Sequence, residues 1–121
     1  MPKIMVVDDN QDTAELMGEV LRLLGNEVAV ASNGEEAISS AAQIRPDVMF
    51  MDIGLPGMDG YAVARALRSQ PETAATVLIA VTGYGQCEDV RMAHEAGFDH
   101  HVVKPADLNR IGEILASLSG R

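Results

Sequence analysis

Five side chains that are capable of chemistry lie directly after four short apolar runs in this sequence. In chain order they are Asp8, Asp9, Asp52, Thr82 and Lys104. The runs that precede them span residues 4–7, 48–51, 77–81 and 102–103. If the runs are strands of one parallel sheet, their carboxyl ends meet at the edge where open α/β sheets bind ligands. We therefore predict that the five side chains line one pocket.

Three carboxylates in one pocket need a positively charged partner. At about 5 Å and an effective dielectric constant of about 20, each pair repels by roughly 3 kcal/mol. Hard oxygen ligands without a cluster of cysteine or histidine favour Mg²⁺, or alternatively Mn²⁺, over Zn²⁺. Because Mg²⁺ in proteins keeps waters that phosphate groups can replace, Asp8, Asp9 and Asp52 indicate phosphoryl chemistry.

The pocket also offers the three protein groups that a phosphoryl acceptor needs. A carboxylate such as that of Asp52 can attack phosphorus and form an acyl phosphate. A lysine and a hydroxyl donor, here Lys104 and Thr82, can bind the oxygens of the transferred group. Each residue alone has a simpler explanation, because aspartate and threonine are common in turns and lysine in solvent. Their joint occurrence at successive strand ends favours a reactive site.

The apolar runs alternate with segments of helical periodicity, which is typical of βα units around a parallel sheet. Five units are predicted, because residues 27–31 form one more β-prone stretch. The first helix is expected to have its cap at Asp12 and to stop at Gly25. Its apolar face holds Leu16, Met17, Val20, Leu21 and Leu24.

Four more helices follow from the same reasoning. The second is expected to open at Asn33-Gly34 and to end at Arg45-Pro46. The third stops near Pro71, and its apolar residues are Tyr61, Val63, Ala64 and Leu67. The fourth spans residues 88–96. The fifth is amphipathic through Leu108, Ile111, Leu115 and Leu118.

Size, charge and cysteine content narrow the class of protein. At 121 residues, the chain suits one domain over residues 1–121 and is too short for an attached output domain. Lys and Arg number 9 against 18 Asp and Glu, and the formal net charge of -9 argues against binding nucleic-acid phosphates. No apolar stretch is long enough to cross a membrane or to form a signal peptide. Because Cys87 is the single cysteine, a reducing, cytoplasmic location is expected.

Four segments of the sequence together resemble the receiver domain of two-component response regulators. They are Val6-Val7-Asp8-Asp9-Asn10, Met51-Asp52-Ile53-Gly54-Leu55-Pro56-Gly57-Met58-Asp59-Gly60, Val81-Thr82-Gly83 and Val103-Lys104-Pro105. The resemblance spans essentially the whole chain and is to receivers that stand alone or accompany hybrid histidine kinases. It implies an α/β, flavodoxin-like, doubly wound parallel sheet of five strands in the order 2-1-3-4-5, with five helices.

The resemblance also implies how the acidic residues divide their roles. Asp52 would be the phosphoacceptor. Asp9 would bind Mg²⁺ directly and Asp8 through water. The Gly54 backbone carbonyl would be a further protein ligand of the metal.

The remaining implied roles concern the response to phosphorylation. Lys104 would pair with a phosphoryl oxygen, and its bond to Pro105 would be cis, an isomer that is common only before proline. Thr82 would swing toward the phosphoryl group. Three residues before the lysine the family usually carries Tyr or Phe, whereas this chain has His101. Because imidazole titrates near neutral pH, the switch is expected to be weaker or pH-dependent, unless His101 has no switch role.

The function implied is that of a phosphoacceptor in a His-Asp phosphorelay, a regulatory domain and not an enzyme with turnover. The donor would be a sensor histidine kinase or a histidine phosphotransfer domain, and the output would pass to a downstream protein partner. Two alternatives remain. One is a binding-only receiver that is never phosphorylated. The other is a magnesium-dependent phosphohydrolase with an aspartate nucleophile, although such enzymes commonly carry a second acid where this chain has Gly54.

Overall fold

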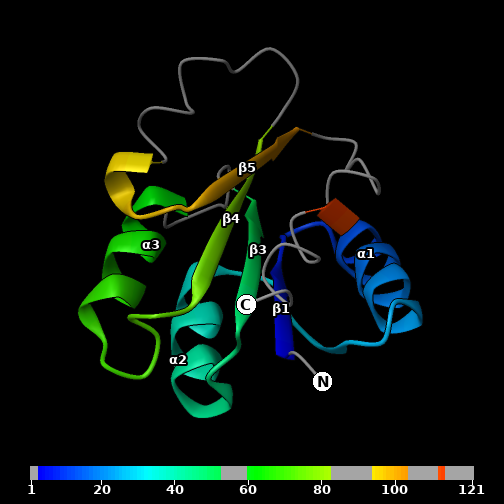
Figure 1. The fold of residues 1–121 in the computed structure, drawn as a ribbon, viewed down its shortest axis with the longest axis horizontal. Helices are drawn as coiled ribbons and strands as arrows, with labels where there is room; N and C mark the ends of the chain where they lie inside the picture. Colours follow the sequence, from blue (N-terminus) through cyan, green and yellow to red (C-terminus); the bar gives the residue numbers. More distant parts are fainter. Residues whose placement is uncertain (1–2, 53–59, 83–93, 104–111, 114–121) are drawn as a thin grey trace.

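The computed structural model describes residues 3–52, 60–82, 94–103 and 112–113. Within them, a five-stranded parallel sheet has the order β2-β1-β3-β4-β5 (Figure 1). Its strands are β1 (Lys3–Val7), β2 (Glu27–Ala31), β3 (Val48–Asp52), β4 (Val77–Thr82) and β5 (His100–Val103). The predicted flavodoxin-like order 2-1-3-4-5 is therefore confirmed.

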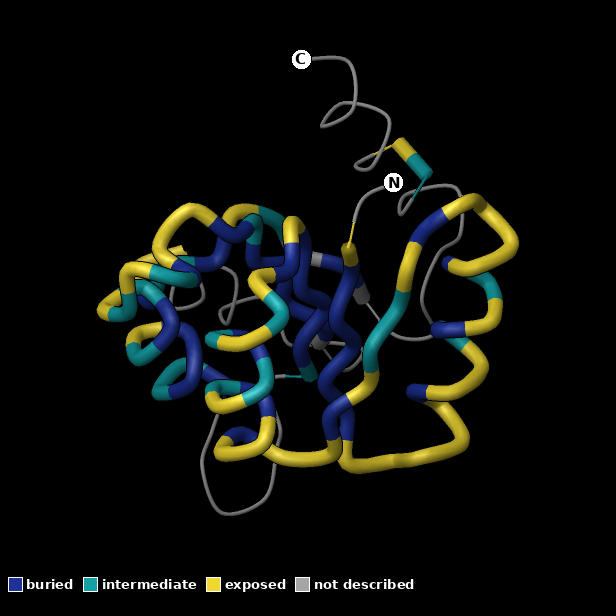
Figure 2. Tube along the Cα trace, turned by 90° about the horizontal axis from the view of Figure 1, so that it is seen from below, coloured by how far each residue is buried: buried dark blue, intermediate teal, exposed yellow. Residues whose placement is uncertain are grey.

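The central strands are buried on both sides, as their continuous apolar sequences require. Four of the five residues of β1 and four of the five of β3 are buried. Figure 2 shows these strands as the dark core of the molecule. Val7 of β1 pairs with Ala31 on one side and Met51 on the other. This register brings the residues after β1 and at the end of β3 to the same edge of the sheet.

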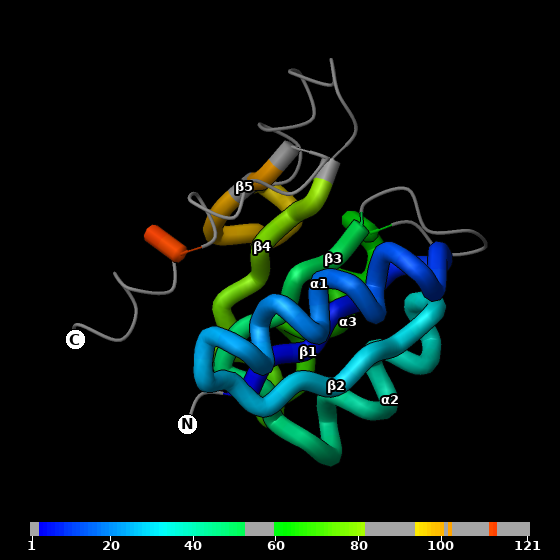
Figure 3. The backbone as a smooth tube through the Cα atoms, turned by 90° about the vertical axis from the view of Figure 1, so that its right-hand side faces the viewer, coloured from blue at the N-terminus to red at the C-terminus, as the bar shows by residue number. Residues whose placement is uncertain are grey.

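Successive residues of each strand point to opposite faces of the sheet, which produces two separate apolar cores. One core contains Met5, Met49 and Leu78 together with residues of α2 (Gly34–Ile44) and α3 (Gly60–Ser69). The other contains Ile4, Phe50 and Ile79 together with residues of α1 (Gln11–Leu23). Helix α1 thus covers one face, and α2 and α3 cover the other (Figures 1 and 3).

The start of α1 differs from the prediction. The cap is Asn10 and not Asp12, because the Asn10 side chain accepts a hydrogen bond from the Thr13 backbone N–H at 3.1 Å. Asp12 instead lies in the first turn, where a negative charge suits the helix dipole. The predicted stop is confirmed, since Gly25 follows the helix with φ 96°, a conformation that favours glycine.

The face that α1 presents to the sheet also differs from the prediction. Leu21 is fully buried, but Leu16 is 64% exposed and Leu24 is 57% exposed. The other buried residues of the helix are Ala14 and Gly18. These small side chains let the helix lie close to the sheet, and they were overlooked because the prediction counted only large apolar residues.

The second helix begins and ends as predicted, and the third ends as predicted. Asn33 caps α2 by accepting from the Glu36 backbone N–H at 2.8 Å, and Arg45 ends it with φ 53°. Helix α3 ends at Ser69, two residues before Pro71. Of the predicted fourth and fifth helices, only 94–96 and 112–113 lie within the described residues, and both segments are helical. None of the described helices has the length and apolar character needed to span a bilayer.

Candidate functional site

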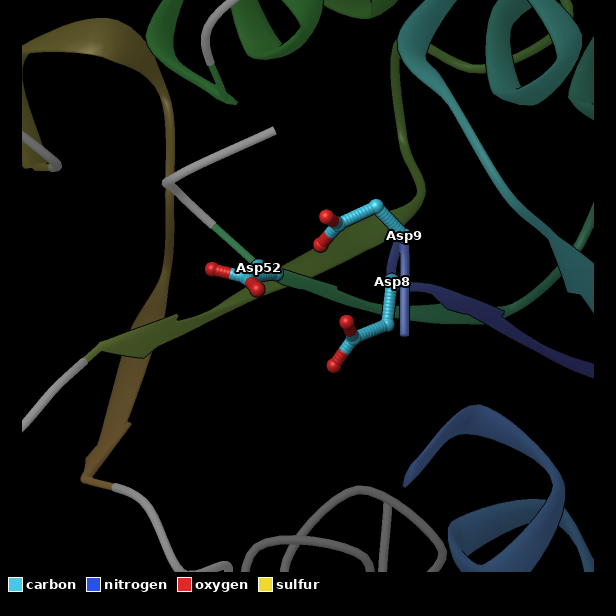
Figure 4. Close-up of side chains that lie close together, drawn as sticks. All are labelled: Asp8, Asp9 and Asp52. Atoms are coloured by element: carbon cyan, nitrogen blue, oxygen red, sulfur yellow. The ribbon is translucent and has the colours of Figure 1, made fainter. Parts of the chain in front are cut away.

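The carboxylates of Asp8, Asp9 and Asp52 converge at the carboxyl edge of the sheet (Figure 4). Each offers an oxygen that lies within 4.8 Å of those of the other two. Asp8 and Asp9 directly follow β1, and Asp52 is the last residue of β3. Because β1 and β3 are paired neighbours, strand pairing itself brings the three side chains together.

The three carboxylates differ in their exposure to solvent. Asp8 is only 5% exposed, Asp52 is half-buried and Asp9 is exposed. The Asn10 backbone N–H donates to Asp8 Oδ1 at 2.9 Å, and the Asp8 backbone N–H donates to the Ala31 carbonyl at 3.1 Å. Asp8 is therefore held on both sides, by the turn into α1 and by β2.

The donor set suits a small divalent cation. Two oxygens on opposite sides of one magnesium ion are about 4.2 Å apart. Carboxylate oxygens that lie within 4.8 Å of one another are close to that spacing. At this distance each pair of ionised carboxylates repels by roughly 3 kcal/mol at an effective dielectric constant of about 20, and a cation removes that repulsion. Carboxylate oxygens are also the hard ligands that magnesium prefers.

A groove of about 620 Å³ extends from the carboxylate cluster between α1 and the end of β2. Its lining residues are Asp8, Asp9, Gln11, Glu15, Glu19, Arg22, Val30, Ser32 and Glu36. Acidic side chains thus outnumber the single basic one, Arg22. The groove therefore attracts cations and basic side chains to the edge of the sheet where the cluster lies.

The structure describes the other predicted site residues only in part. Thr82 is the last residue of β4 and pairs with Val103, while His101 of β5 pairs with Ala80. The side chains of Thr82 and His101 are outside the described part of the chain. Gly54, Lys104 and Pro105 lie wholly outside the described residues, so their predicted roles stay predictions.

One contributor to the site was missed by the sequence analysis. Asn10 contributes its backbone N–H to Asp8 and its side chain to the cap of α1. The available signal was an asparagine directly before the helix, a favoured cap residue. The prediction preferred Asp12 because Glu15 follows it by three residues, as in a capping box.

The sequence of this chain matches a family model and several known proteins. The family model for the response regulator receiver domain matches residues 4–116. The transcriptional regulatory protein PrrA of Mycobacterium tuberculosis is 41% identical over 105 residues, 86% of this chain and 44% of that protein. The DNA-binding response regulator MtrA of Mycolicibacterium smegmatis is 38% identical over 103 residues, 85% of this chain and 44% of that protein. The chain thus spans less than half the length of these curated relatives.

Solved structures of similar fold cover nearly the whole chain. The receiver domain of a sensor histidine kinase from Pseudomonas aeruginosa has a TM-score of 0.89 and 30% identity, covering 99% of this chain and 98% of that chain. That structure has a magnesium ion coordinated in its active site cleft. The chemotaxis response regulator CheY4 of Vibrio cholerae has a TM-score of 0.88 and 27% identity, covering 97% of this chain and 98% of that chain.

Proposed function

This chain belongs to the family of response regulator receiver domains, and on that premise we propose that Asp52 is its phosphoacceptor. Receiver domains are phosphoacceptor signalling domains of two-component systems. The observation that carries the assignment is the convergence of Asp8, Asp9 and Asp52 within 4.8 Å. Asp52 is half-buried, so its carboxylate belongs to the cluster and is also accessible to a phosphoryl donor from outside.

The proposed step is transfer of a phosphoryl group from a phosphohistidine. An oxygen of the Asp52 carboxylate forms a bond to phosphorus, and the bond from phosphorus to the donor imidazole nitrogen breaks. The electron pair of that bond stays on the imidazole nitrogen, which takes up a proton. The product is an aspartyl phosphate on this chain and a neutral histidine on the donor.

Asp8, Asp9 and Asp52 are the residues that would hold Mg²⁺, or alternatively Mn²⁺, with the Gly54 carbonyl as a proposed further ligand. When bound, the cation supplies positive charge that offsets the negative charge of the phosphoryl oxygens. The chain contributes orientation. Asp8 is buried and held by the Asn10 backbone, so its carboxylate is in place before any ligand arrives.

Lys104 and Thr82 are proposed as the groups that bind the phosphoryl oxygens. Support for this pairing comes from the register of β4 and β5, in which Thr82 pairs with Val103, the residue before Lys104. Thr82 and Val103 therefore fall at the same edge of the sheet as Asp52, and Lys104 follows Val103 in the sequence. We propose that Thr82 and His101 respond to phosphorylation, and that the Lys104-Pro105 bond is cis.

The proposed donor is a sensor histidine kinase or a histidine phosphotransfer domain, and the proposed recipient of the signal is a downstream protein. MtrA is a DNA-binding response regulator, but this chain spans only 44% of its length. With a formal net charge of -9, the chain is proposed to make no direct contact with nucleic acid. The proposed location is cytoplasmic, and the proposed chemistry is limited to phosphoryl uptake and loss by autodephosphorylation.

Intact-mass spectrometry after incubation with phosphoramidate and Mg²⁺ tests the proposal. The wild-type chain should gain one phosphoryl group, and the adduct should disappear in Asp52→Asn and in the presence of a chelator. Asp47→Asn is the matched control, because Asp47 lies just before β3 at the opposite edge of the sheet. An adduct that persists in Asp52→Asn would refute the assignment. Steady turnover of generic phosphomonoesters would instead favour a phosphohydrolase, and lack of any adduct a binding-only receiver.

A further inference from the structure

The guanidinium group of Arg68, near the end of α3, joins two loops at the amino edge of the sheet. Its Nε and Nη2 donate to the Gly97 carbonyl at 3.0 and 2.7 Å. Its Nη1 donates to the carbonyls of Ala74 and Thr76 at 2.9 and 2.6 Å. Its Nη2 also forms an ion pair with Asp99 Oδ2 at 2.7 Å. We call these five residues the Arg68 clasp. It ties the segment before β4 to the segment before β5.

Gly97 fits the clasp in a way that other residues cannot. Its φ of +117° is a backbone conformation that residues with a side chain rarely adopt. A Cβ atom added at Gly97 would lie 2.8 Å from Arg68 Cγ and 3.2 Å from Nε. The turn before β5 therefore lies directly against the Arg68 side chain. A side chain added at Gly97 would displace Arg68.

Asp99 connects the clasp to the first pairing of β5 with β4. Its Oδ2 accepts from the Leu78 backbone N–H at 2.9 Å as well as from Arg68. Its backbone N–H donates to the Leu78 carbonyl at 2.7 Å. The next pair along the two strands is Ile79 with His100, the first residue of β5. The clasp thus sets the point on β4 at which β5 begins.

We infer that Arg68 is a positioning residue that places β5, and so its Val103 end, at the edge of the sheet where Asp52 lies. Strand β5 has only four residues, and within the described chain it pairs with β4 alone. So short an edge strand has few contacts of its own to fix its position. Its length of about 13 Å carries the chain from Asp99 to Val103, and Lys104 is next. The inference rests on the proposed function, because it assigns Lys104 to the phosphoryl group.

Three substitutions and one control test the inference. Arg68→Gln removes the positive charge and most of the N–H donors. Arg68→Lys keeps the positive charge, but its single side-chain nitrogen cannot donate to both loops as the guanidinium does. Gly97→Ala leaves the guanidinium intact and displaces it by the added methyl group. Arg65→Gln is the control, because Arg65 is exposed on the same helix. If one clasp variant does not fold, the others decide the question.

Three measurements are made on each folded variant. The rate of phosphoryl uptake from phosphoramidate is followed by intact mass, the affinity for Mg²⁺ by calorimetry, and the Val102 and Met5 backbone amides by NMR. Arg68→Gln and Gly97→Ala should lower the rate by about tenfold or more, because small displacements of catalytic partners have large effects on rate. The rate of Arg68→Lys should lie between the rates of these two variants and the rate of the wild type. The Val102 resonance should move, whereas the Met5 resonance and the Mg²⁺ affinity should stay at the wild-type values.

The outcomes separate this inference from a general loss of stability and from failure of the proposed function. A clasp variant with the wild-type rate, or with rate and Mg²⁺ affinity falling together, would overturn the positioning role. If the wild-type chain itself takes up no phosphoryl group, the proposed function fails. The placement of β5 by Arg68 is then decided by the Val102 amide alone, and an unchanged resonance in Arg68→Gln would overturn it.

Discussion

Asn10 links the acidic cluster to α1, because its backbone N–H holds the Asp8 carboxylate at 2.9 Å while its side chain caps the helix. The Asp8 carboxylate, a proposed metal ligand, and the start of α1 therefore depend on the same residue, Asn10. The buried carboxylate is oriented by the same turn that directs the chain into α1. A change in this turn is expected to affect both the stability of the helix and the affinity of the site.

Asn10→Ala should lower the free energy of unfolding by about 1 kcal/mol, since the cap of α1 is lost. It should also weaken Mg²⁺ binding by up to about tenfold, because the Asp8 carboxylate loses the ordered turn that holds it. Asn33→Ala is the matched control, because Asn33 caps α2 in the same way, by accepting from the Glu36 backbone N–H. Urea unfolding and calorimetric titration of both variants give the comparison. Equal Mg²⁺ affinities in the two variants would contradict the link.

Asp8→Asn should raise the stability of the metal-free chain by about 1 kcal/mol, because it relieves repulsion within a cluster whose oxygens lie within 4.8 Å. Asn10 can still donate to the remaining side-chain oxygen. The gain should shrink in high salt, which screens repulsion among the partly exposed groups. Thermal unfolding in a chelating buffer measures it, and a lower stability than wild type would show that repulsion does not dominate.

Mg²⁺ should stabilise the wild-type chain, because an ion that binds the folded state alone shifts the unfolding equilibrium. At a concentration of about 100 times its Kd the gain is about 2.7 kcal/mol. The increase in Tm with Mg²⁺ should vanish in Asp8→Asn and persist in the exposed-site control Asp12→Asn. A similar increase in both variants would place the ion elsewhere.

Substitution by alanine should change the stability of the chain in opposite directions at Gly18 and at Gly97. At Gly18 within α1, the nearest atom to an added Cβ is Val28 Cγ1 at 3.5 Å, an ordinary contact. Gly18→Ala should therefore stabilise the chain by up to about 1 kcal/mol through helix propensity. Gly97→Ala should destabilise it, because the added Cβ would lie 2.8 Å from Arg68 Cγ at a φ of +117°. Thermal unfolding of the pair tests both signs.

Replacing His101 by phenylalanine tests the switch that the sequence suggests. A neutral imidazole can turn into an apolar interior, but an imidazolium is costly to bury. Because imidazole gains a proton near neutral pH, the response of the wild type should be smaller at about pH 6 than at about pH 8. His101→Phe should show the same response to phosphorylation at both pH values. The measurement is the change in backbone amide resonances on phosphorylation, and a pH-independent wild type would remove His101 from the switch.

Local sequence patterns were sufficient for the strands and for the convergence of three carboxylates, whereas the strand order followed from the resemblance to receiver domains. Apolar runs such as Val48–Met51 belong to buried parallel strands, and the residue after each run falls at a shared edge. The inward face of α1 was harder to predict. Leu16 is apolar but exposed, and the close approach of α1 to the sheet is made by Ala14 and Gly18, which a search for large side chains overlooks.

Contacts between residues distant in sequence were beyond such reasoning. Arg68 binds Gly97 and Asp99 across 29 and 31 residues, and no local pattern around Arg68 announces these partners. An arginine near the end of a helix is most simply explained as a solvated charge that favours the helix dipole. Only the assembled sheet brings the two loops within reach of one guanidinium.

The Arg68 clasp and the acidic cluster lie at opposite edges of the sheet, and this separation has a mechanical consequence. Just before β5, Asp99 is held by the ion pair with Arg68 and by two hydrogen bonds to Leu78 of β4, one through its carboxylate and one through its backbone N–H. From there to Val103 it is supported along one side by β4, the strand to which it pairs in the described chain. The four residues of β5 thus join the anchor at Asp99 to the edge where Asp52 lies, so a change in the clasp reaches Val103 through the pairing of β5 with β4.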